Sequence, residues 1–149
     1  MLQLEIDEMI KCPIDQVFAR LADISAYSQW LPPEGIFVST RQLSQGPIGV
    51  GTTYRDRTTL GTFRGEVIEF QRPTKIVFKH RLHWLGIPVL ETCPGYILEA
   101  TEGGTKLHHT AKGRLFGIFR LIRPRANHFA RKERKRTVAE LKASLESLP

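Results

Sequence analysis

Several common sequence signals are missing from this chain, and each absence excludes a class of protein. No apolar run approaches the ~20 residues that a membrane-spanning helix needs. The patterns GxGxxG, GxxxxGK[ST] and GxSxG do not occur, which argues against dinucleotide, phosphoryl-transfer and serine-hydrolase chemistry. Neither HExxH nor a paired-cysteine spacing is present. We therefore predict no metal site and no cofactor.

Cysteine is scarce as well. Only Cys12 and Cys93 occur, and they do not form a CxxC pair. Free thiols in a reducing cytoplasm are the usual state of such cysteines. The first twelve residues, MLQLEIDEMIKC, alternate and include acidic side chains, which is not typical of a signal or transit peptide. We therefore expect a cytoplasmic protein.

The composition is that of a globular protein. Hydrophobic residues make up 41% and charged residues 25% of the 149 positions, a balance that permits a packed core. A chain of this length is one ordinary domain. Since no repeat, linker or low-complexity stretch interrupts it, we predict a single domain over residues 1–149.

Positive charge is concentrated in one segment. Lys112–Arg136 contains ten Lys and Arg and one acid, Glu133, whereas the rest of the chain holds twelve bases and fourteen acids. A charge run of this kind most often forms a solvated helix face. The second interpretation is a surface that attracts anionic membrane lipids. Nucleic acid ranks last as a partner, because the segment contains no known DNA- or RNA-binding motif.

Alternating apolar and polar residues predict strands through most of the chain. The first covers Leu2–Ile10 and ends before Pro13, after which apolar residues such as Val17 and Leu21 recur at helical spacing. Two short helices are predicted here, and they end at Trp30–Pro33 because proline cannot continue a helix. Turn residues separate six further predicted strands, which cover Gly35–Leu43, Thr52–Leu60, Thr62–Gln71, Lys75–Trp84, Val89–Ala100 and Thr105–Leu115. Connections this short favour antiparallel pairing.

A long amphipathic helix is predicted after Gly117. A stripe of mainly apolar residues recurs there at steps of three or four. Its members are Phe119, Ile122, Ala126, Phe129, Glu133, Thr137, Leu141, Leu145 and Leu148. Pro124 predicts a kink or a restart in the first part of the helix. The predicted fold is therefore α+β, with a curved antiparallel sheet of about seven strands, two short helices after the first strand and a long C-terminal helix on the concave face.

This order of elements, together with several short motifs, resembles the START-like (SRPBCC) superfamily. The similar stretches are Ile10–Phe18, Trp30–Pro32, Gly49–Thr52, Gly65–Val67, Arg72–Pro73, Gly103–Leu107 and Leu141–Lys142. The closest resemblance is to its polyketide cyclase/dehydrase and lipid-transport branch, which implies the helix-grip fold. None of the motifs is catalytic, and the superfamily includes lipid carriers, quinone-binding proteins, plant hormone receptors and aromatic cyclases. The resemblance therefore implies an architecture rather than one chemistry.

Strand alternation and the helical stripe together identify side chains that should face each other across one layer. The predicted ligand-binding residues are Tyr54, Phe78, His80, Leu82, Tyr96, Leu98, His109 and Ala111 on the strands, and Phe119, Ile122, Phe129 and Glu133 on the helix. An inward histidine or tyrosine has two interpretations, which the residues leave open. It either forms part of the wall without a chemical role or orients a ligand by hydrogen bonding.

Glu133 has two interpretations of its own. A carboxylate on an apolar stripe is costly unless it is paired, and an inward Glu133 would meet His80 or His109. Alternatively, Glu133 lies at the edge of the stripe and pairs with a base on the same helix.

Three functions fit these observations. The first hypothesis is binding of a small hydrophobic molecule, such as a lipid, a quinone or a polyketide-like aromatic, in a cavity between the sheet and the C-terminal helix. The alternative is an enzyme of cyclase or dehydratase type, in which inward His, Tyr and Glu side chains transfer protons. The third is a nucleic-acid-associated module that uses the basic helix. The sequence assigns no catalytic residue.

Overall fold

The computed structural model describes residues 2–31 and 37–147, which form one sheet with helices at two places in the chain. Its strands are β1 (Leu2–Ile10), β2 (Phe37–Gln42), β3 (Thr53–Thr58), β4 (Gly61–Gln71), β5 (Lys75–Trp84), β6 (Ile87–Thr101) and β7 (Gly104–Leu115). The helix α1 (Ile14–Ala22) and the 3-10 helix η1 (Ile24–Gln29) lie between β1 and β2. The 3-10 helix η2 (Gly117–Ile122) and the long helix α2 (Arg123–Glu146) follow β7. The predicted α+β helix-grip fold is confirmed.

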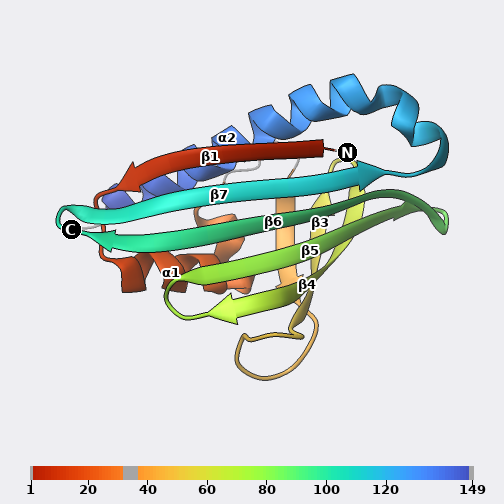
Figure 1. Ribbon diagram of the computed structural model, residues 1–149. Coiled ribbons are helices and arrows are strands. Elements are labelled where there is room, and N and C mark those ends of the chain that lie inside the picture. The colour runs from red at the N-terminus through yellow and green to blue at the C-terminus, as the bar shows by residue number, and fades with distance from the viewer. Residues whose placement is uncertain (1, 32–36, 148–149) are drawn as a thin grey trace.

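The sheet is antiparallel throughout, with the strand order β1-β7-β6-β5-β4-β3-β2. From β2 to β7 each strand pairs with the next one in the sequence, as short turns require. β1 then joins β7 and completes the sheet. Figure 1 shows that the sheet curls across its width, so that β3 runs steeply across the direction of β6 and β7. This curvature creates the space between the sheet and the helices.

α2 packs against the sheet on its β1 side. Pro124 lies in the first turn of the helix, where its missing N–H is not needed, so the helix restarts after η2 as predicted. The buried side chains of the second half are Val138, Leu141 and Leu145, at steps of three and four residues. Leu148, the last member of the predicted stripe, lies outside the described residues. None of the described helices is both long and apolar enough to span a bilayer.

α1 covers the end of the sheet where β1 finishes. The helix starts at Ile14, directly after Pro13, and buries Val17, Phe18 and Leu21 on one face. The predicted strand Gly35–Leu43 begins among residues that the structure does not describe, and its described part starts at Phe37. The motif residues Pro32 and Pro33 also lie outside the described part of the chain.

The buried side chains form two separate hydrophobic clusters. The larger one joins α1, the middle of the sheet and the second half of α2, and it includes Ile10, Phe18, Ile76, Leu107 and Leu141. The smaller one consists of Phe63, Leu82 and Val89, with Leu90 and Phe119 packed against it. Side chains of both clusters line one cavity.

Candidate ligand-binding cavity

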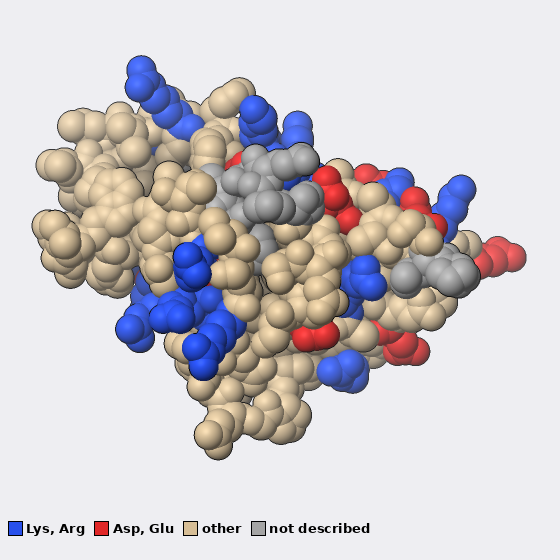
Figure 2. All heavy atoms as spheres, turned by 180° about the vertical axis from the view of Figure 1, so that it is seen from behind, with Lys and Arg blue, Asp and Glu red and all other residues tan. Residues whose placement is uncertain are grey.

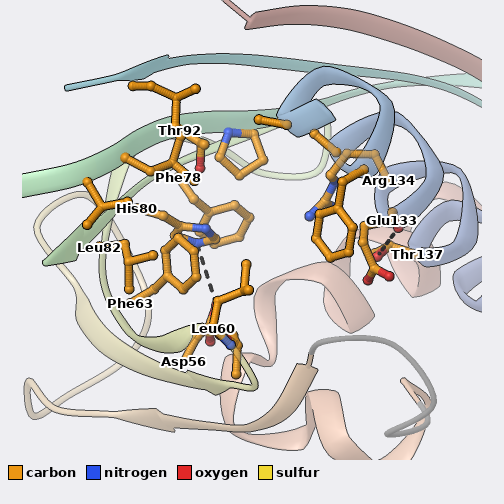
Figure 3. A pocket seen from close by; sticks show the side chains of 18 of the residues that line it. Asp56, Leu60, Phe63, Phe78, His80, Leu82, Thr92, Glu133, Arg134 and Thr137 are labelled. Carbon is orange, nitrogen blue, oxygen red and sulfur yellow. Dashed lines mark hydrogen bonds and ion pairs between the residues drawn. The ribbon is translucent and has the colours of Figure 1, made fainter. Parts of the chain in front are cut away.

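A cavity of about 400 Å3 lies between the curved sheet and α2, and its lining is mainly apolar. Side chains of both hydrophobic clusters contribute to its wall, which places the cavity between them. From the larger cluster come Tyr54, Phe78 and Tyr96, and from the smaller one Phe63 and Leu82. Figure 3 shows Phe63, Phe78, His80 and Leu82 on one side and Glu133, Arg134 and Thr137 of α2 on the other.

The period of the strands explains which side chains reach the cavity. On β3, Tyr54, Asp56 and Thr58 all line it, because alternate residues share a face. Gly65 of β4 stands opposite Tyr54 in the sheet. A Cβ atom at this glycine would lie 2.2 Å from the ring of Tyr54, so only glycine leaves room for the ring.

One polar group lies in the wall formed by β3 and β5. The hydroxyl of Tyr54 shares a hydrogen bond with Nε2 of His80, and Oδ2 of Asp56 lies 3.8 Å from the same nitrogen. The hydroxyl of Thr40 donates a hydrogen bond to the other oxygen of this carboxylate. In Figure 3 the side chains of Asp56 and His80 approach each other from neighbouring parts of the wall. A phenol, an imidazole and a carboxylate therefore meet at one place.

Burial moves the proton affinities of these three groups. It raises the pKa of Asp56 to about 6, although the Thr40 hydrogen bond and the charge of Arg134 act in the opposite direction. Burial, assisted by the charge of Arg134, lowers the pKa of His80 to about 3. The pKa of Tyr54 is raised well above 10, first by burial and then by the nearby Asp56. At neutral pH, His80 is therefore uncharged, and Asp56 is the member of this group that titrates nearest neutrality.

A second polar group is centred on Arg134, which reaches from α2 to β6 and β7. Its Nη2 donates a hydrogen bond to the hydroxyl of Tyr96 at 2.7 Å, and its Nε donates to Nε2 of His109 at 3.0 Å. His109 in turn donates from Nδ1 to the carbonyl oxygen of Gly95 at 2.8 Å. Because Nδ1 carries the proton, Nε2 keeps the lone pair that accepts from Arg134, and His109 is neutral. Burial and the charge of Arg134 accordingly lower the pKa of His109 well below its ordinary value.

Arg134 brings a positive charge to the cavity wall, and none of the described carboxylates is its direct partner. Within the described ranges its hydrogen bonds go to neutral groups, and no carboxylate forms an ion pair with it. Its charge does act on Asp56 through space, since it lowers the pKa of that carboxyl. A guanidinium has five N–H donors, and the two hydrogen bonds to protein leave further donors for another acceptor.

The structure brings nine of the twelve predicted site residues together around the cavity. They are Tyr54, Phe78, His80, Leu82, Tyr96, Phe119, Ile122, Phe129 and Glu133. Leu98, His109 and Ala111 are not among its lining residues. Leu98 belongs to the larger hydrophobic cluster, and Ala111 pairs with Leu4 and Pro94 in the sheet. His109 is fully buried and contacts the cavity wall indirectly, through its hydrogen bond with Arg134 and its ring stacked on Tyr96.

Three lining residues that carry charge were not predicted: Asp56, Arg125 and Arg134. Asp56 shares a strand face with Tyr54, so alternation places it inward, but a carboxylate is not expected there from residue type alone. Arg134 stands four residues before Val138 and seven before Leu141, both buried. Helical spacing therefore puts Arg134 on the inner face too. It was not predicted as a cavity residue because it stands in a run of bases, which is typical of a solvated face.

Glu133 lines the cavity next to Arg134 and is half-buried. The hydroxyl of Thr137 donates a hydrogen bond to its backbone carbonyl at 2.9 Å (Figure 3). The hydrogen bonds of His80 and His109 go to the other groups described above. In the described part of the chain, no three His, Cys, Asp or Glu side chains gather closely enough to hold a metal ion.

The chain belongs to the family described as polyketide cyclase/dehydrase and lipid transport, which matches residues 1–146. This match confirms the resemblance found in the sequence. A comparison with curated proteins finds no match.

Solved structures share the fold at low sequence identity. Protein MLL2253 from Mesorhizobium loti is 15% identical, with a TM-score of 0.75 over 99% of this chain and 98% of that one. A putative uncharacterised protein from Rhizobium leguminosarum is 20% identical, with a TM-score of 0.75 over 98% and 95% of the two chains. BexL, a di-domain ARO/CYC from the BE-7585A biosynthetic pathway, is 16% identical, with a TM-score of 0.75 over 99% of this chain and 51% of BexL. At these identities, the likenesses establish the fold alone.

Proposed function

We propose that the protein binds a small hydrophobic molecule that carries an oxygen function, such as a lipid, a quinone or a polyketide-like aromatic, in the cavity between the sheet and α2. A volume of about 400 Å3 is within the range of small-molecule sites, roughly 300–1,000 Å3. The aromatic side chains Phe63, Phe78 and Phe129 favour a flat or apolar ligand body. Membership of a family described by polyketide and lipid chemistry supports the same class of ligand.

Arg134 is the observation that carries this proposal. A guanidinium in a mainly apolar wall is costly unless its donors are used, and two of them already bond neutral groups at 2.7 and 3.0 Å. A ligand carbonyl, carboxylate or phenolate oxygen would accept the remaining hydrogen bonds and, when charged, would balance the positive charge. The ligand is therefore oriented with its oxygen towards Arg134 and Tyr96.

A matched pair of fluorescent probes tests both parts of the proposal. N-Phenyl-1-naphthylamine and 1-anilinonaphthalene-8-sulfonate share one aromatic body, and only the second carries an anionic oxygen group. We expect the protein to bind both, and Arg134→Met to weaken the anionic probe by about tenfold more than the neutral one, since a hydrogen bond to a charged group contributes about 1.5–3 kcal/mol. Native mass spectrometry of the freshly purified protein would identify the class of any bound molecule.

A pair of helix variants serves as the control for location. Ala130 lines the cavity, whereas Ala139 is exposed on the same helix. Ala130→Trp fills the space and should weaken both probes, while Ala139→Trp should leave both affinities unchanged. If a folded Ala130→Trp protein bound both probes like the wild type, the cavity would not be the binding site. Equal losses of both probes in Arg134→Met would remove the oxygen-orienting role.

Proton transfer on a bound ketone is a second candidate, favoured by the group around Asp56. A general base works best when its pKa is near the working pH, and burial brings that of Asp56 to about 6. In such a step the Asp56 carboxylate takes a proton from the carbon next to the ligand carbonyl. The resulting enolate oxygen receives a hydrogen bond from Tyr54, and return of the proton restores both groups.

Deuterium exchange separates the enzyme from a binding protein. An aryl ketone incubated with the protein in D2O should gain deuterium next to its carbonyl, as followed by NMR, and Asp56→Asn should abolish the acceleration. Glu102→Gln, at an exposed turn position, is the matched control that keeps it. An exchange rate equal to that in buffer, for a ketone that displaces the neutral probe, would leave binding as the function and reject the enzyme.

A further inference from the structure

Large apolar side chains are exposed together at one end of the molecule. Ile118 and Leu121 of η2 are 77% and 85% exposed, and Leu85 in the β5–β6 turn is 103% exposed. Ile87 and Ile122 are about half exposed beside them. These five residues are called the apolar tip. Isolated surface leucines are common, but a group of this kind marks an interaction surface.

The two parts of the apolar tip are adjacent in space. The rings of Trp84 and Phe119 lie edge to face at 5.3 Å and join the end of β5 to η2. Figure 1 shows the β5–β6 turn and the start of α2 at the same end of the fold. Trp84 and Phe119 also line the cavity, together with Ile122. The tip therefore surrounds one end of the cavity.

The conformation of Leu85 is a second, independent sign of function. Leu85 and Gly86 form a two-residue turn between the paired residues Trp84 and Ile87, and both have positive φ, at 51° and 80°. Asn, Asp or Gly normally occupies the first of these positions, because a larger side chain is strained there. A fully exposed leucine thus has neither a conformational nor a packing reason in this structure. Strained backbone of this kind clusters at functional sites such as ligand clamps and switch regions.

Positive charge accompanies the apolar tip. Arg120, Arg123 and Arg125 are exposed on η2 and the first turn of α2, and within the described residues none of them forms an ion pair. Figure 2 shows the molecule from behind, with this end on the left. Blue Lys and Arg side chains flank the tan surface there, and most of the red Asp and Glu side chains lie towards the opposite end.

We propose that this end docks on an anionic lipid bilayer, with the apolar tip inserted among the acyl chains and the arginines at the phosphate layer. Aliphatic side chains bordered by arginines match the two layers of a membrane surface, which are apolar inside and negatively charged outside. Docking in this orientation would turn the cavity end that Trp84 and Ile122 line towards the lipid. The proposal does not depend on the identity of the cavity ligand.

The same charges argue against the other occupants of this surface. A second copy of the chain, related by two-fold symmetry, would bring the arginines of both copies together and would be repelled. A nucleic acid would pair with the arginines, but the five aliphatic side chains of the tip offer it neither hydrogen bonds nor aromatic stacking.

Vesicle co-sedimentation tests the proposal with the intact protein. Vesicles of phosphatidylcholine with and without phosphatidylglycerol are compared at about 0.1 M salt and at about 1 M salt, where the Debye length falls from ~10 to ~3 Å. We expect binding to the anionic vesicles that weakens at high salt. Ile118→Gln with Leu121→Gln should reduce it by about tenfold or more, and so should Arg120→Gln with Arg123→Gln. All four residues are exposed, so the fold should remain intact.

Matched controls come from the turn before β3 and from the start of β7. Val50 is an exposed apolar residue and Lys106 an exposed base, and Val50→Gln and Lys106→Gln should bind vesicles like the wild type. No binding to anionic vesicles at low salt would overturn the proposal. Binding that persists in the Ile118/Leu121 variant would show adsorption elsewhere and would overturn it as well. So would a dimer that this variant abolishes, or tighter binding to RNA or duplex DNA than to the vesicles.

Discussion

Replacing Asp56 with Asn tests whether the cavity keeps a carboxylate at the expense of stability. The side chain is 16% exposed, and burial raises its pKa from 3.8 to about 6. Each tenfold change in proton affinity corresponds to about 1.4 kcal/mol, so ionised Asp56 destabilises the folded state by about 3 kcal/mol. Asparagine has nearly the same shape and no charge, and its oxygen can accept the hydrogen bond that Thr40 donates to Asp56.

The direction of the effect follows from the raised pKa. A carboxyl with a higher pKa in the folded protein binds its proton more tightly there than in the unfolded chain. Protonation of Asp56 therefore adds to the unfolding free energy, and this contribution is complete below about pH 4 and is lost as the pH rises through about 6. The Asp56→Asn variant does not lose this stability as the pH rises, because asparagine does not ionise. The variant should therefore exceed the wild type in unfolding free energy by about 0.5 kcal/mol near pH 4 and by about 3 kcal/mol near pH 8. His80 is present in both proteins, and its own titration largely cancels in the comparison.

Urea unfolding followed by the fluorescence of Trp30 and Trp84 measures this difference at each pH. Glu102→Gln, which removes an exposed carboxylate, should stay within about 0.5 kcal/mol of the wild type at both ends of the range. A variant that is no more stable than the wild type near pH 8, or a gain that does not change with pH, would refute the argument.

Three further predictions concern packing and backbone conformation, each read from thermal or urea unfolding. Gly65→Ala should lower the unfolding free energy by about 2 kcal/mol, because its Cβ would lie 2.2 Å from a tyrosine ring, whereas Gly103→Ala, with nothing within 4 Å, should be close to neutral. Leu85→Asn should raise the stability by about 1 kcal/mol, because asparagine tolerates the positive φ of 51°; an unchanged stability would remove the strain argument. Leu141→Ala should lose about 2–5 kcal/mol in the core, and the exposed Leu121→Ala less than about 0.5.

The strands follow from the sequence because their determinants are local. β5 runs from Lys75 to Trp84, as alternation predicts, and glycine and proline turns fix the short connections of the other strands. With every connection too short for a parallel crossover, the antiparallel order from β2 to β7 follows as well. The restart of the last helix at Pro124 is equally local, since proline fits the first turn of a helix.

The rotation of α2 is less well determined by its sequence. Two stripes fit the helical period, one through Glu133 and Thr137 and one through Arg134 and Val138, and both meet at Leu141. In the basic half of the helix, hydrophobicity favours the stripe through Glu133, because Ala126 and Phe129 precede Glu133 at helical spacing. Packing against the sheet brings both stripes to the inner side and gives Arg134 its hydrogen bonds to Tyr96 and His109.

The sequence by itself determined the strand order from β2 to β7, the turns and which residues share a face, since these depend on neighbours a few positions apart. Only the tertiary structure decided where the core divides into two clusters, and that the charged Asp56 and Arg134 lie in the wall between them. A charge enters such a wall only when distant residues supply its partners. Thr40 and His80 do so for Asp56, and β6 and β7 do so for Arg134. Partners from different strands meet only through the curvature of the whole sheet, which no local pattern encodes.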